Sequence, residues 1–108
     1  MNNIYLNPSP LRQKFIEHLT LNRKAERTVH CYVSFIYSLA EYTRRSPDLL
    51  GPEDIRRWLY HLIAERKQAP STVNLAINSV RSFYGKMLQR DIEPLLHQIQ
   101  RPRRPARL

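Results

Sequence analysis

The stretch STVNLAINSVRSFYGKML, residues 71–88, decides the fold that this sequence predicts. Apolar residues recur in it at steps of three and four, which is the period of an amphipathic helix. Either Ser71 or Thr72 is expected to cap its N-terminus. The apolar stripe is the clearest in the chain, so this helix should be the central packing element. Its members are Val73, Ala76, Ile77, Val80, Phe83, Tyr84, Met87 and Leu88.

The polar face of the same helix carries a distinctive set of side chains. Asn and Arg make bidentate contacts to the edges of adenine and guanine, while Ser, Thr and Lys reach phosphates. The residue types therefore fit contact with DNA, and they equally fit a solvated surface. The stripe consists of Asn74, Asn78 and Arg81, with Ser79, Ser82 and Lys86 beside it. Gly85 lies near this face, where either a close partner or a slight bend would explain it.

Three further helices are predicted at about residues 10–22, 26–45 and 52–67. The first has Ser9 as N-cap and Pro10 at its first position, and Pro52 opens the third. The buried face of the third helix is expected to contain Ile55, Trp58, Leu59, Leu62 and Ile63. A short helical turn follows at 94–99.

The composition supports an all-α domain. The 108 residues contain only two glycines, so the chain has little of the turn chemistry that a small β-protein requires. The prediction is a compact four-helix bundle over residues 10–100. Residues 1–9 form an N-terminal arm, and residues 101–108 form a basic C-terminal tail without an apolar period.

The charge balance favours an acidic or phosphate-bearing partner. Eighteen Lys and Arg stand against nine Asp and Glu, which gives a net charge of +9. The tail contributes four arginines, and it is either a solubilising end or a basic linker laid along DNA. A second cluster, residues 22–28, places three cations near the N-terminus of a helix, where free N–H groups hold phosphate, or else it is a solvated loop.

Catalytic and metal chemistry find little support. His18, His30, His61 and His97 are scattered one per segment, and Cys31 is the single cysteine, expected to be a partly buried filler. No glycine-rich phosphate loop or GxSxG motif occurs, so no cofactor and no metal are expected. No signal peptide or membrane span is visible, which predicts a cytoplasmic protein without a membrane partner.

Taken in order, these segments resemble the N-terminal core-binding, or SAM-like, domain of tyrosine recombinases and phage or integron-type integrases. The resemblance covers residues 10–108. Its most specific parts are GPEDIRRWLYHL at 51–62 and STVNLAINSVRSFY at 71–84, and KAERTVHCYVSFIYSLAEY at 24–42 and RPRRPARL at 101–108 agree with it.

The resemblance implies a SAM-like four-helix bundle that clamps one face of a recombination site, with its second and fourth helices against the major groove. Leu75 departs from the family pattern, which often has a basic residue there. The expected contacts with double-stranded DNA, some from the residue chemistry and some from the resemblance, are Lys24, Arg27, Thr28, Ser71, Thr72, Asn74, Asn78, Arg81, Lys86, Arg101, Arg103 and Arg104.

Catalysis in such recombinases belongs to a separate C-terminal domain with an HxxR motif and a nucleophilic tyrosine. No HxxR occurs here, because Gln100 stands three residues after His97. The chain is therefore expected to bind DNA and cut nothing, as a nucleoid-associated part of a recombinase. Its further partners would be the catalytic domain of the parent protein and other recombinase subunits on DNA.

Two other functions stay open from the sequence. One is a helical protein-interaction or assembly domain with an incidental basic tail, and the other is an RNA-binding, ribosome-associated protein. Replacing Asn74 and Arg81 by alanine should weaken DNA binding with little change in melting if the DNA hypothesis holds.

Overall fold

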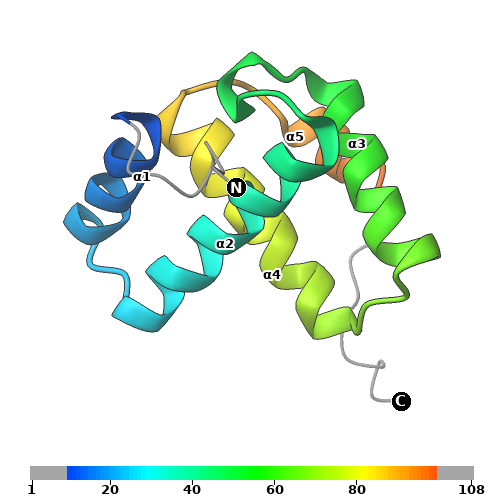
Figure 1. The fold of residues 1–108 in the computed structure, drawn as a ribbon, viewed down its shortest axis with the longest axis horizontal. Coiled ribbons are helices and arrows are strands. Elements are labelled where there is room, and N and C mark those ends of the chain that lie inside the picture. The colour runs from blue at the N-terminus through cyan, green and yellow to red at the C-terminus, as the bar shows by residue number, and fades with distance from the viewer. Residues whose placement is uncertain (1–9, 100–108) are drawn as a thin grey trace.

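The computed structural model describes residues 10–99, and every regular element in that range is helical (Figure 1). This confirms the predicted all-α class. The order is α1 (Pro10–Leu21), α2 (Glu26–Thr43), η1 (Pro47–Leu49), α3 (Pro52–Tyr60), α4 (Pro70–Val80) and α5 (Glu93–His97). No helix in this range is long and apolar enough to cross a membrane.

Two of the helices end in widened turns. α3 continues into η2 (His61–Glu65) and α4 into η3 (Arg81–Met87). Their closing backbone bonds span five residues: the Arg66 N–H donates to the His61 carbonyl at 2.9 Å, and the Leu88 N–H donates to the Phe83 carbonyl at 3.0 Å. With these extensions the four main helices cover nearly their predicted ranges.

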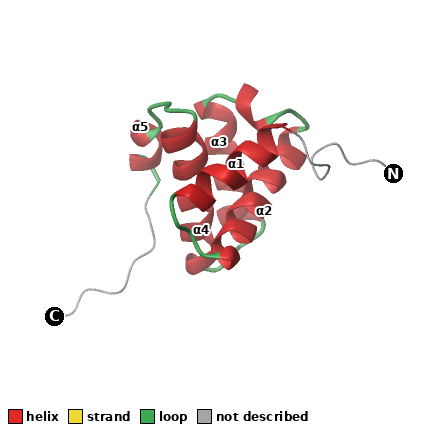
Figure 2. Cartoon of the chain, turned by 90° about the vertical axis from the view of Figure 1, so that its left-hand side faces the viewer, coloured by secondary structure: helices red, strands yellow, loops and turns green. Residues whose placement is uncertain are grey.

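The helices form two hairpins that pack across each other. α1 and α2 make one hairpin, α3 and α4 make the other, and α2 packs against α4 at the centre (Figure 1). Figure 2 shows the same helices closely stacked and joined by short loops. In Figure 1 the α1–α2 turn lies at the lower left and the α3–α4 turn at the lower right, so α2 and α4 start at opposite ends of the lower side and cross at the centre.

Aromatic side chains fill the core where these elements meet. Phe15 of α1 and Phe83 of η3 make an edge-to-face contact with ring centroids 5.0 Å apart. Trp58 and Tyr84 are completely buried, and the Tyr84 hydroxyl donates to the Pro47 carbonyl at 2.6 Å. Burial raises the pKa of Tyr84 well above its usual range. The predicted burial of Trp58, Phe83 and Tyr84 is confirmed.

Three predicted orientations are wrong. Ile63, expected in the core, is 43% exposed, while Ser79 and Ser82, expected beside the polar stripe, are 0% and 7% exposed. Ile63 lies in η2, where a wider turn rotates each residue less than an α-helix does and so shifts the apolar stripe. Ser79 fits inside because its hydroxyl donates to the Ala76 carbonyl of its own helix at 2.7 Å.

The predicted capping of the fourth helix is also wrong. α4 begins at Pro70, and its N-cap is Ala69, which has no side-chain capping bond. Proline suits the first helical position because the N–H it lacks would have no partner there. Ser71 and Thr72 therefore lie inside the first turn. Ser9, the expected cap of the first helix, lies outside the described residues.

Candidate nucleic-acid interface

The start of α2 presents the first group of predicted contact residues. Lys24 and Arg27 are exposed and Thr28 is half-buried. Neither cation forms an ion pair with another residue in the range 10–99. The N-cap of α2 is Ala25, which supplies no side-chain capping bond to the first N–H groups of the helix.

The first turns of α4 carry the second group. Ser71 is exposed, and Thr72, Asn74 and Asn78 are half-buried. Asn74 and Asn78 each already make an interaction within the chain, so a base contact would have to replace or share it. Leu75 lies between them and is 41% exposed, so an apolar side chain interrupts the polar stripe.

Arg81 and Lys86 lie farther along the same helix and differ from each other. The Arg81 guanidinium donates hydrogen bonds to both carboxylate oxygens of Glu93, from Nε at 2.9 Å and from Nη2 at 3.2 Å. Lys86 is exposed near the end of η3, at the opposite end of the helix from Ser71. A Cβ at Gly85 would meet only Arg81 Cγ, at 3.9 Å, so packing within the described chain does not require glycine.

Arg101, Arg103 and Arg104 lie outside the described residues. Their assignment as DNA contacts stays a prediction.

The structure adds cations that the sequence analysis did not place at the site. Arg66 and Lys67 lie on the α3–α4 turn and are exposed. As cations, they also suit the negative C-terminal end of the third helix. Because the turn to α4 is short, the same residues also stand just before the start of α4. The short spacing between the third and fourth helices was the feature of the sequence that could have indicated this position.

We call the exposed cations of the two turns the basic edge; they are Arg23, Lys24, Arg27, Arg66 and Lys67. None of them forms an ion pair with a described residue, and the two turns lie at opposite ends of the lower side of the molecule in Figure 1. Glu26 and Glu65 are the acidic residues of these segments, which leaves an excess of three positive charges (five minus two).

Acid-paired arginines occur in other parts of the fold. Arg45 lies 3.5 Å from Asp54, Arg56 pairs with Glu53, and Arg81 pairs with Glu93. The pKa of Glu53 is lowered, first by its hydrogen bond with Arg56. Carboxylates neutralise these three arginines, whereas no described carboxylate pairs with the cations of the basic edge.

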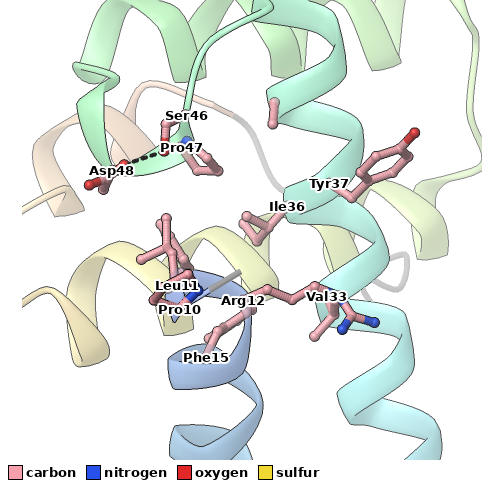
Figure 3. A pocket seen from close by; sticks show the side chains of 12 residues that line it. Pro10, Leu11, Arg12, Phe15, Val33, Ile36, Tyr37, Ser46, Pro47 and Asp48 are labelled. Carbon is pink, nitrogen blue, oxygen red and sulfur yellow. Dashed lines mark hydrogen bonds between the residues drawn. The ribbon is translucent and has the colours of Figure 1, made fainter. Parts of the chain in front are cut away.

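One hollow in the described surface is lined mainly by apolar residues. It has a volume of about 440 Å³ and lies between α1, α2 and η1 (Figure 3). Leu11, Phe15, Val33 and Ile36 are among its lining residues. Within residues 10–99 no group of three or more His, Cys, Asp or Glu side chains is placed to hold a metal ion.

Comparison with known proteins agrees with this architecture. Residues 11–94 match the phage integrase N-terminal SAM-like domain. A protein of Sinorhizobium fredii named as an integrase/recombinase (y4qK) is 33% identical over 100 residues, which is 93% of this chain and 32% of that protein. Integrase/recombinases of Escherichia coli and Pseudomonas aeruginosa are each 36% identical over 83 residues, covering 76% of this chain and 24% of theirs.

No solved structure gives a significant match to the chain. The chain spans about a third of the length of the Sinorhizobium relative. Since the match to the domain family covers most of the chain and the fold has the expected four main helices, the chain belongs to the phage integrase N-terminal SAM-like domain family.

Proposed function

We propose that this domain binds double-stranded DNA as the core-binding domain of an integrase or recombinase. The observation that carries the proposal is the basic edge, where five cations without described acid partners lie at or next to the starts of two helices, at the two ends of the lower side in Figure 1. Duplex DNA presents rows of phosphates, and phosphate contacts supply most of the affinity of such proteins.

The two helix starts suit phosphate for a second reason. The N-caps of α2 and α4 are alanines without capping bonds, and a helix N-terminus with open N–H groups attracts anions. α3 differs, because the Gly51 N–H at its start donates to the Asp54 carboxylate at 3.0 Å. The first turn of α4 has no acidic residue, and that of α2 has Glu26 alone, so these two helix starts are less occupied by acidic groups than that of α3.

Sequence preference would come from the side chains of α4 behind the basic edge. Asn74 and Asn78 are the residues suited to adenine edges, and Thr72 and Ser71 to phosphates. In the whole recombinase, this domain would position the duplex beside a catalytic domain and other subunits. The 108 residues contain no HxxR, so strand cleavage would require residues beyond them.

Paired charge substitutions test the proposal. Lys24→Gln with Arg27→Gln removes two charges from the basic edge, and Lys14→Gln with Arg57→Gln removes two exposed charges elsewhere. Binding to a random 30-base-pair duplex is measured by fluorescence anisotropy across a salt series. Each lost phosphate contact lowers the slope of log K against log salt by about 0.9. We expect a reduction of about 2 for the first double variant and much less for the second.

Equal slopes for the two double variants would contradict the proposal. They would favour a protein-interaction domain instead, for which the apolar hollow of Figure 3 would be a candidate contact surface. Stronger competition by structured RNA than by duplex DNA would favour the RNA-binding alternative.

A further inference from the structure

A second, smaller hollow lies beside the basic edge, between α2 and the α3–α4 turn. It has a volume of about 370 Å³. Ser34 and Ser38 line it from α2, Arg66 and Gln68 from the turn, and Thr72 from the first turn of α4. Each of these side chains offers a hydrogen-bond donor, and no carboxylate is among the described residues that line the hollow.

The hydroxyl groups of this hollow are not used inside the described part of the chain. Thr20, Thr43 and Ser79 donate to carbonyls of their own helices at 2.8, 3.0 and 2.7 Å. Ser34, Ser38 and Thr72 have no such bond to any residue in the range 10–99. Three hydroxyls are therefore available at one surface hollow, while other hydroxyls of the domain are satisfied locally.

The backbone of the turn holds Arg66 beside these hydroxyls. The Arg66 N–H donates to the His61 carbonyl at 2.9 Å, and the Gln68 N–H donates to the Leu62 carbonyl at 3.0 Å. The guanidinium itself has no ion-pair partner among the described residues. These backbone bonds hold the turn so that the Arg66 guanidinium lies beside a hollow lined by hydrogen-bond donors.

We propose that this hollow binds a backbone phosphate of duplex DNA. Arg66 would supply the charge, and the hydroxyls of Thr72 and Ser38 would donate to the phosphate oxygens. Guanidinium and hydroxyl donors are the groups that bind phosphate oxygens in proteins. The inference rests on the proposed DNA binding and adds a subsite to it, made largely of residues outside the predicted contact set.

The chain contains its own reporter for this subsite. Cys31 is the single cysteine of the sequence, is half-buried, and lines the same hollow. A phosphate seated there would cover the thiol. The rate at which neutral iodoacetamide alkylates Cys31, followed by mass spectrometry, therefore reads occupancy of the hollow without any substitution.

The test uses the full chain with and without a saturating 30-base-pair duplex. We expect the duplex to slow alkylation of Cys31 several-fold, and inorganic phosphate at equal ionic strength to slow it far less. Arg66→Gln should weaken DNA binding roughly tenfold, the size of a lost charge-assisted contact. Thr72→Val, which keeps charge and shape, should weaken it roughly threefold. Arg57→Gln removes the same charge from an exposed site outside the hollow and serves as the control.

Several results would overturn the subsite. These are a duplex that binds and leaves the alkylation rate unchanged, Arg66→Gln and Arg57→Gln variants with equal affinity, or a Cys31 that does not react in the free protein. Equal slowing by inorganic phosphate would assign the hollow to a free anion. In each case DNA binding by the other four cations of the basic edge would still stand, whereas a wild-type chain that binds no duplex would overturn both proposals.

Discussion

Arg81 and Glu93 show at the residue scale how a surface cation is used inside the fold. The Arg81 side chain is 29% exposed, and its two contacts with Glu93 tie η3 to α5. His97 lies 3.9 Å from the same carboxylate. This position gives Arg81 a structural partner that the sequence pattern did not reveal.

The first prediction concerns this pair. We expect Arg81→Gln to destabilise the domain, because it breaks a bidentate contact. The sequence alone predicts little change in melting on replacement of Arg81. Since both side chains are partly exposed, the coupling to Glu93→Gln should be only about 0.5–1 kcal/mol. A thermal or urea double-mutant cycle measures it. A cycle with zero coupling would show that the pair does not fasten α5, and would leave Arg81 available for DNA.

The helix ends are the distinctive feature at the element scale. The chain has only two glycines, and four other residues near the helix ends adopt the left-handed backbone conformation. They are Arg23, Arg44, Lys67 and Gln89, with φ between 49° and 62°. Glycine adopts this conformation without steric cost and is the usual residue there. Three of the four residues are cations, which interact favourably with the negative helix C-terminus.

The second prediction follows from the steric strain of a side chain on left-handed backbone. Gln89→Gly should raise the free energy of unfolding by about 0.5–1 kcal/mol, because it relieves a left-handed side chain at φ 56°. Gln13→Gly makes the same replacement inside α1 and should lower stability by about 1 kcal/mol. Chemical denaturation of both variants checks the pair. Loss of stability in Gln89→Gly would mean that its side chain stabilises the turn by contacts that outweigh the strain.

Much of the secondary structure could be predicted from the sequence. Pro10, Pro52 and the apolar stripe of residues 73–88 set the helices, because proline and a 3.6-residue period act locally. Ile63 and Ser79 could not be placed, since the widened turn η2 and a hydroxyl bond to the helix backbone depend on the packed structure.

The candidate site was predictable in part, for a related reason. Lys24 and Arg27 stand next to a recognisable helix start. The hollow containing Arg66 requires two segments distant in sequence to meet, which depends on how the hairpins cross. The partners of Asn74 and Arg81 likewise arise from tertiary structure.

At the scale of the whole molecule, charge is divided between the helical domain and the tail. The chain carries +9, and residues 101–108 contribute four of those charges. The described helices keep a positive edge of their own, at the starts of α2 and α4. The central claim is that this edge, and not the tail alone, binds DNA.

The most direct measurement compares residues 1–108 with a version ending at Gln100, each titrated against a random 30-base-pair duplex by fluorescence anisotropy over a salt series. We expect both to bind, with the shorter chain retaining most of the affinity. A slope of log K against log salt of roughly −5 to −7 for the full chain corresponds to six to eight neutralised phosphates. Loss of binding with the tail, or a slope near zero, would contradict the claim and make the helices a scaffold or docking domain.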